Sequence, residues 1–186
     1  MKLFKVLISA FLLCLPCFAG TDEVVEGARA QLGKTLFYDP AYVKLDYPGG
    51  DVPIVRGVCT DVVIRALRAS KIDLQQLIHE DMKANFSKYP NNWGLTKPDA
   101  NIDHRRVPNI VRYYERQGKT LPLPVKVENV QPGDLVAWML PNNRPHIGVV
   151  VEIKNGKARI VLNIGLGARE EAVLYDWDII AHIRPL

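Results

Sequence analysis

Hydrophobic residues recur at helical spacing in the first two thirds of the chain, whereas in the last third they run together or alternate as they do in strands. The helical pattern covers residues 21–35, 57–70, 72–86 and 107–118. Thr21 and Asp73 stand where N-caps are expected, and Gly118 ends the last of these segments. Between them, residues 37–57 and 90–105 are rich in Pro, Gly, Asn and aromatic residues, which predicts loops with short extended pieces.

The C-terminal third predicts an antiparallel sheet. A turn followed by a strand is expected over residues 131–140, and further strands over 146–153, 157–165 and 177–186. The dipeptide Asn155-Gly156 separates two apolar runs, which is the strongest short-range signal for a β-hairpin. Since the helices precede the strands, the fold class expected is α+β, with N-terminal helices packed on a C-terminal antiparallel sheet in one domain.

The first 19 residues have the layout of a secretory signal peptide. Lys2 and Lys5 form a basic start, Val6 to Phe18 form an apolar run, and Cys17 and Ala19 are small residues before a cut after Ala19. The run has 13 residues, fewer than the roughly 20 that a membrane-spanning helix needs. We therefore expect a cleaved leader over residues 1–19, no stable membrane anchor, and an exported, periplasmic domain over residues 20–186.

Loss of the leader changes both the charge and the cysteine count. The net charge falls from +4 to +2, without a concentrated basic face, which argues against nucleic-acid binding. The leader also takes Cys14 and Cys17, so Cys59 is the one cysteine left in a compartment where disulfides form. An unpaired cysteine in an exported protein is either buried and inert or a reactive thiol.

Cys59 lies in the first turn of a predicted helix. The free N–H groups and the dipole of a helix N-terminus favour a thiolate, and Gly57 allows a sharp turn and close approach of a substrate. The alternative is that Cys59 is only a small apolar member of the helix's buried stripe.

A cysteine nucleophile needs a base, and the base needs a group that orients it. If the hairpin turns on Asn155-Gly156, Gly148 lies opposite Asn163, and His146 and Asn163 share one face of the sheet. The opposite face is then wholly apolar and forms the core, with Ile147, Val149, Val151 and Ile153. The chain order Cys, His, Asn is that of cysteine peptidases.

Five segments, "GVCTDVVIRAL", "NIDHRRVPN", "PGDLVAW", "HIGVVV" and "NIGLG", together resemble an exported bacterial family labelled as a domain of unknown function. That family is placed with the NlpC-type, papain-like cysteine peptidases, and the resemblance extends over most of residues 24–186. It implies a papain-like fold, Cys59 and His146 as nucleophile and base, hydrolysis of amide bonds in cell-wall peptide, and no metal.

The family is expected to read "HNIG" where this chain reads "LNIG", so Leu162 replaces a histidine. If that histidine orients the base, this chain is impaired; the hairpin register instead favours Asn163 in that role.

Charged residues before the fourth helix are candidate substrate-binding groups. Asp103, Arg105 and Arg106 lie close together, and an arginine can hold a carboxylate through two parallel hydrogen bonds. The alternative is a loop whose charges face water or pair with one another.

Residues on the Cys59 helix have simpler interpretations. Asp61 is either a first-turn acid favoured by the helix dipole or a group that helps to position His146. Arg65 and Arg68 are expected to face solvent. No H-E-x-x-H and no G-x-G-x-x-G is present, so neither a zinc site nor a nucleotide cofactor is expected.

Together these features predict a periplasmic cysteine peptidase or amidase that acts without a cofactor on peptidoglycan or another peptide-like substrate. Two alternatives stay open. One is a cell-envelope binding module of the same fold that has lost turnover, which the replacement at Leu162 motivates. The other is an acyl-transfer enzyme that uses the same cysteine and histidine.

Overall fold

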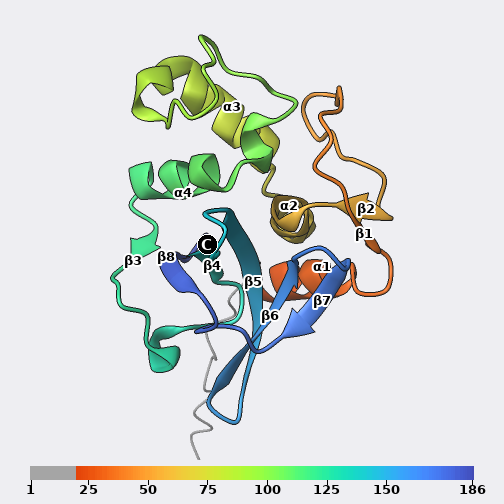
Figure 1. Ribbon diagram of the computed structural model, residues 1–186, viewed down its shortest axis with the longest axis vertical. Helices are drawn as coiled ribbons and strands as arrows, with labels where there is room; N and C mark the ends of the chain where they lie inside the picture. Colours follow the sequence, from red (N-terminus) through yellow and green to blue (C-terminus); the bar gives the residue numbers. More distant parts are fainter. Residues whose placement is uncertain (1–19) are drawn as a thin grey trace, which may run out of the picture.

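The structure is a computed structural model that describes residues 20–186, so the predicted leader lies outside the described residues. Helices come first along the chain and the main sheet follows (Figure 1). The helices are α1 (Thr21–Arg29), α2 (Cys59–Ala69), α3 (Leu74–Asn85) and α4 (Val107–Arg116), with the short 3-10 turns η1 (Phe86–Lys88), η2 (Asp103–Arg105) and η3 (Val127–Asn129). The strands are β1 (Phe37–Tyr38), β2 (Arg56–Gly57), β3 (Thr120–Leu121), β4 (Leu135–Met139), β5 (Pro145–Lys154), β6 (Lys157–Asn163), β7 (Ala168–Glu171) and β8 (Asp178–Ile183).

The main sheet is antiparallel, with the strand order β3-β8-β4-β5-β6-β7. Strands β1 and β2 form a separate parallel pair. The predicted hairpin is present, because Lys154 pairs with Lys157 across the Asn155-Gly156 turn. The α+β prediction is therefore confirmed. Strand β7 was not predicted, because its sequence "AREE" is short and polar and only its pairing with β6 makes it a strand.

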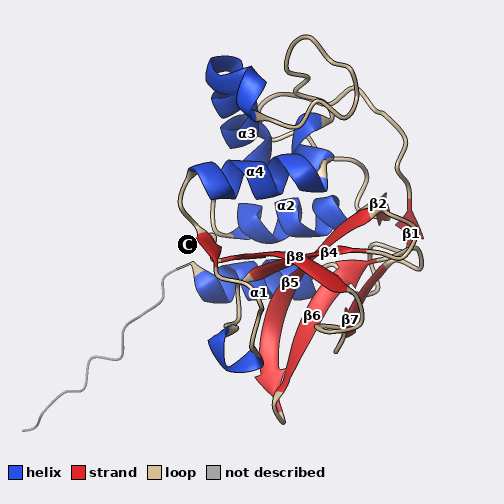
Figure 2. Cartoon of the chain, turned by 60° about the vertical axis from the view of Figure 1, so that its left-hand side comes forward, coloured by secondary structure: helices blue, strands red, loops and turns tan. Residues whose placement is uncertain are grey.

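The sheet separates two hydrophobic clusters. Figure 2 shows α2, α4 and α3 stacked on one side of the sheet, with α3 farthest from it. That side holds the larger cluster, which includes Cys59, Ile147 and Val149, as predicted for the core face of β5. The other side holds a second cluster, which includes Val136, Trp138, Val150, Ile160 and Leu162. Ile153, predicted to belong to the core, is 37% exposed near the end of the hairpin.

The helix boundaries follow their capping groups. Asp73 caps α3 as predicted, accepting a hydrogen bond from the N–H of Gln75 at 3.1 Å. The N-cap of α1 is Gly20 instead of Thr21, and the Glu23 carboxylate accepts the Gly20 N–H at 2.9 Å. Helix α1 is also shorter than predicted, since it ends at Arg29 and the chain continues in turns. No helix of residues 20–186 has the length and apolar character needed to cross a membrane.

Candidate functional site

Cys59 is the first residue of α2 and lies in the wall of a cavity of about 190 Å³. The cavity is also lined by Tyr38, Trp93, Arg106 and Pro145. The cysteine is 4% exposed and belongs to the larger hydrophobic cluster. It is therefore part of the buried stripe, as in the second of the two interpretations, and it also borders a cavity.

Burial governs the protonation of this thiol. It raises the pKa of Cys59 to about 12, while backbone hydrogen bonds from Ile147 and Thr60 act in the opposite direction. The helix N-terminus therefore does not yield a thiolate here, contrary to the expectation from the sequence. The buried Cys59 sulfur therefore carries its proton at neutral pH.

His146 lies near the start of β5, is 3% exposed, and pairs across the sheet with Trp138 of β4. It lines a second cavity, of about 500 Å³, together with Tyr38, Arg144 and Pro145. Burial lowers the pKa of His146 to about 4, so the ring is neutral at pH 7. Its Nε2 atom is buried and has no hydrogen-bond partner among the described residues.

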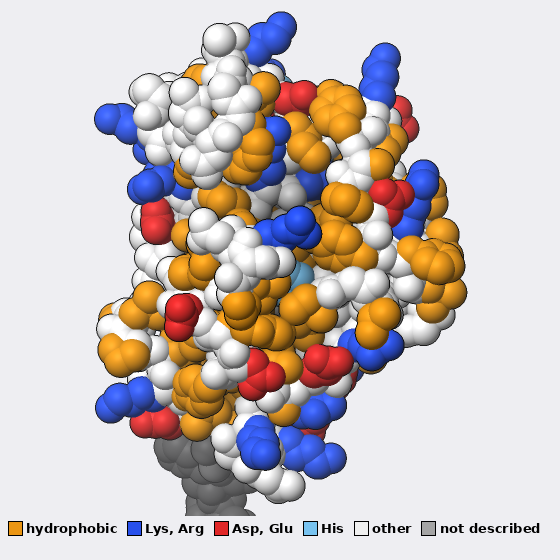
Figure 3. Space-filling model, viewed as in Figure 1, with side chains coloured by type: hydrophobic (Ala, Val, Ile, Leu, Met, Phe, Trp, Pro, Cys, Tyr) orange, Lys and Arg blue, Asp and Glu red, His pale blue; other side chains and the backbone are white. Residues whose placement is uncertain are grey.

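The cavities of Cys59 and His146 adjoin each other, because Tyr38 and Pro145 line both. The thiol also receives backbone hydrogen bonding from Ile147, the residue after His146 on β5. No hydrogen bond joins the sulfur to the imidazole within residues 20–186. The fold thus brings the predicted nucleophile and base to neighbouring cavities without a direct bond between them. Figure 3 shows this face of the molecule hollowed near α2 and α4, with hydrophobic and basic side chains around the hollow.

The predicted register of the β5–β6 hairpin is wrong beyond its first few pairs. A bulge between Val150 and Glu152 shifts the pairing by one residue, so that Val149 lies opposite Val161. A one-residue shift reverses which side chains share a face. Asn163 therefore lies on the helical side of the sheet, where its Nδ2 donates to the Gly57 carbonyl at 2.9 Å. It fixes the chain before α2 and does not orient His146.

Leu162, in contrast, lies on the face that His146 occupies. It belongs to the same cluster as Trp138, the direct partner of His146, and is 1% exposed. A Cβ on Gly148, two residues after His146, would lie 3.2 Å from the Leu162 Cβ. The position where the resembled family is expected to carry histidine thus lies on the same face of the sheet as His146, and here it is apolar.

Asp61 and Arg105 form a buried ion pair, so the Asp61 carboxylate is not free to bind substrate, while Arg105 also lines the Cys59 cavity. Arg105 donates to both carboxylate oxygens of Asp61, at 2.8 and 2.9 Å, and the two side chains are 2% and 3% exposed. Asp61 also accepts the N–H of Val58 at 2.6 Å, which caps α2. Arg105 further donates to the Ala41 carbonyl at 3.1 Å. The pair therefore ties the start of α2 to the loop after β1, and the roles predicted for Asp61 in substrate binding and in positioning His146 are corrected.

Gly57 is needed for this arrangement, because a Cβ there would lie 2.9 Å from Asp61 Oδ2. The prediction that a substrate backbone would use this space is thus corrected, since a side chain of the protein occupies it.

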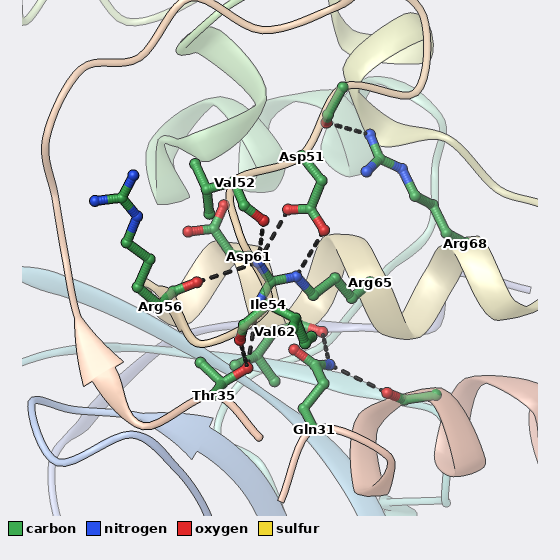
Figure 4. Close-up of polar contacts among 12 residues, drawn as sticks. Gln31, Thr35, Asp51, Val52, Ile54, Arg56, Asp61, Val62, Arg65 and Arg68 are labelled. Carbon is green, nitrogen blue, oxygen red and sulfur yellow. Dashed lines mark hydrogen bonds and ion pairs between the residues drawn. The ribbon is translucent and has the colours of Figure 1, made fainter. Parts of the chain in front are cut away.

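Arg65 holds the segment before the Cys59 helix. The prediction that its side chain faces solvent is wrong. Its side chain is 7% exposed, and Figure 4 shows it surrounded by Thr35, Asp51, Val52 and Arg56. It donates to both Asp51 oxygens, at 2.8 and 3.1 Å, and to the Arg56 carbonyl at 3.1 Å. Residues 51–56 are therefore fixed against the outer side of α2.

Asp103 and Arg106 line a third cavity, of about 300 Å³, and they also pair with one another, which was the alternative interpretation of this loop. Arg106 donates to Asp103 at 3.0 Å, and its guanidinium carbon lies 3.9 Å from the centre of the Trp93 ring. Trp93 and Arg106 also line the Cys59 cavity, so the two cavities share a wall.

The sequence did not single out Tyr38 or Arg144. Tyr38 is 40% exposed and lines both the Cys59 and the His146 cavities. The aromatic character of residues 37–47 was the available signal, but nothing local indicates that this loop reaches α2. Burial, followed by the nearby Cys59, raises the pKa of Tyr38 to about 12, so its hydroxyl is a hydrogen-bond donor at neutral pH. No group of three His, Cys, Asp or Glu side chains suited to a metal ion occurs in the described part of the chain.

Comparisons with known proteins place these features in a family. The chain is 55% identical over 163 residues to the uncharacterized protein YijF of Escherichia coli strain K12, covering 87% of this chain and 80% of that protein. A solved structure from Staphylococcus aureus, described as similar to lipoprotein of the NLP/P60 family, aligns with 88% of this chain at 15% identity and a TM-score of 0.42. The aligned part is 41% of that protein's length. The family described as "Domain of unknown function (DUF1287)" matches residues 25–185, and the chain therefore belongs to this family.

Proposed function

We propose that this protein is an exported, periplasmic cysteine peptidase or amidase that cleaves an amide bond in a peptide of the cell envelope, with peptidoglycan peptide as the first candidate. The observation that carries the proposal is the placement of Cys59 at the N-terminus of α2, in a cavity that adjoins that of His146. Tyr38 and Pro145 form the shared wall, so a peptide lying over them would contact both side chains.

The reaction starts from a neutral thiol and a neutral imidazole. His146 takes the proton of Cys59 as the sulfur attacks the carbonyl carbon, and it returns that proton to the departing amine. Water then attacks the thioester, giving the free carboxylic acid and restoring the thiol. The backbone N–H of Cys59, at the start of α2, is a donor for the carbonyl oxygen as its charge develops.

A binding module that has lost turnover is the second candidate. Three observations favour it: the neutral thiol, the unpartnered Nε2 of His146, and Leu162 where a polar orienting group would stand. Such a protein would bind the same peptides and release them unchanged.

The test compares the mature protein with its Cys59→Ala and His146→Ala variants on purified cell-wall sacculi. Released fragments are identified by mass spectrometry. The hydrolase predicts fragments with new amino and carboxyl ends that both substitutions abolish. Binding of sacculi without any Cys59-dependent fragment would establish the module instead, and products that join an added amine would indicate acyl transfer.

A further inference from the structure

The cavity beside the thiol is formed by the end of α3, the loop that follows it, η2 and α4. It contains polar groups whose hydrogen-bonding capacity is only partly used within residues 20–186. Asn109 is 1% exposed and donates through Nδ2 to the Asp103 carbonyl at 3.1 Å. Its Oδ1 is buried and accepts no hydrogen bond from the described residues. A buried acceptor left in this state costs about 1–3 kcal/mol, so a ligand N–H that reached it would be favoured.

Arg106 offers the opposite chemistry in the same cavity. One guanidinium nitrogen, Nη1, donates to Asp103 at 3.0 Å, and the guanidinium carbon lies over the Trp93 ring, 3.9 Å from its centre. Nε and Nη2 donate to no group among residues 20–186. These two N–H groups lie on one edge of the planar guanidinium, which is the edge that binds a carboxylate through two parallel bonds.

The charges of the cavity balance. Asp103 and Arg106 contribute one negative and one positive charge, and the carboxylate of Asp103 keeps a lone pair on each oxygen beyond its bonds to Arg106 and the Asp99 N–H. Since Asp103 and Arg106 already neutralise each other, a ligand with a single charge would add an unbalanced charge to the cavity, whereas a ligand with both charges close together would keep the balance and contact both groups.

We propose that this cavity binds a zwitterionic amino-acid end, with its carboxylate on Arg106 and its ammonium on Asp103 and Asn109 Oδ1. The volume of about 300 Å³ and the apolar walls contributed by Met82, Phe86 and Leu95 suit an amino acid with an aliphatic side chain. This inference rests on the proposed function in one respect. Since Trp93 and Arg106 line both cavities, the substrate would be a peptide in which one residue is attached through its side chain and keeps its own amino and carboxyl groups free.

The test measures binding to the Cys59→Ala protein, which separates it from catalysis. Norleucine is compared with hexanoate, which lacks the ammonium, and pentylamine, which lacks the carboxylate. The readout is the NMR shift of the Trp93 indole N–H, assigned with Trp93→Phe. The indole of Trp138, bonded to the Leu174 carbonyl on the far side of the sheet, reports whether each variant keeps its fold.

Norleucine is expected to shift the Trp93 signal and to bind at least about tenfold more tightly than either single-charge analogue. Arg106→Gln should weaken norleucine about tenfold while leaving pentylamine unchanged, and Asp103→Asn should do so while leaving hexanoate unchanged. The control Arg112→Gln, on the exposed side of α4, should change nothing.

Equal binding of norleucine and one single-charge analogue, or no shift of Trp93 at millimolar norleucine, would overturn the inference. So would unchanged norleucine binding by a folded Arg106→Gln protein. Cys59-dependent cleavage of sacculi without norleucine binding would remove this inference and keep the hydrolase. Norleucine binding without Cys59-dependent cleavage would keep this inference and remove the hydrolase.

Discussion

Replacing Arg105 with Met would leave the carboxylate of Asp61 buried without a counter-charge. The wild-type pair has two hydrogen bonds, at 2.8 and 2.9 Å, and both side chains are at most 3% exposed. Removing one partner of such a pair costs about 3–5 kcal/mol, because the remaining charge stays desolvated. That is a large part of the 5–15 kcal/mol by which domains of ordinary stability are folded.

The measurement is urea unfolding followed by tryptophan fluorescence at pH 7. With a slope of about 2 kcal/mol per molar urea, the midpoint should fall by about 2 M. Arg112→Met is the matched control, because its ion pair with Glu115 is on the surface, with side chains 45% and 41% exposed. An exposed pair contributes about 0–1 kcal/mol, so the control midpoint should move little.

A double variant tests the reason for the loss. Asp61→Asn removes the charge, and the amide oxygen can still accept the Val58 N–H that caps α2. The double variant Asp61→Asn/Arg105→Met should lose less unfolding free energy than the sum of the losses of the two single variants, by at least about 1.5 kcal/mol. The reason is that the effects of substitutions at contacting residues do not add. A loss below about 1 kcal/mol for Arg105→Met, or strictly additive losses, would refute the assignment of this pair as the anchor of the Cys59 helix.

Three further outcomes follow from the site. In the absence of substrate, Cys59 should react with iodoacetamide at pH 8 about 10³-fold more slowly than an ordinary thiol, because its pKa is raised from 9.0 to about 12. A rate equal to that of glutathione would contradict the burial of this thiol. Leu162→His should supply a partner for His146 Nε2 and raise Cys59-dependent cleavage about 10–100-fold. Burying a polar ring in this apolar cluster should cost about 1–3 kcal/mol of stability. No gain in cleavage by a folded variant would show that the His146 ring needs no such partner. Burial lowers the pKa of both His104 and His146 to about 4. The unfolded chain therefore binds more protons than the folded chain between pH 4 and 6.5, and the free energy of unfolding should fall as the pH drops through that range. At pH 4 the loss should be about 3 kcal/mol per histidine. Replacing both with Gln should flatten this dependence in urea titrations at pH 7, 5 and 4.

Local patterns predicted the elements of the fold well. The apolar spacing around Val62 and Leu67 marks α2, Asp73 caps α3, and Asn155-Gly156 sets the hairpin, because each signal acts within a few residues. Strand β7 escaped prediction because its pairing partner, and not its own composition, makes it a strand. The roles predicted for the candidate site residues stay predictions. Cys59 and His146 were found from residue type and position, and the structure places them in adjoining cavities.

The sequence by itself determined the order of helices and strands and marked one unpaired thiol on a helix N-terminus. Only the tertiary structure decided what surrounds that thiol. A single bulge after Val150 reversed the faces of Asn163 and Leu162, and no local signal announces a bulge. Burial likewise decided that the thiol is protonated and that Asp61 and Arg105 bind each other, since desolvation depends on chain segments far apart in sequence.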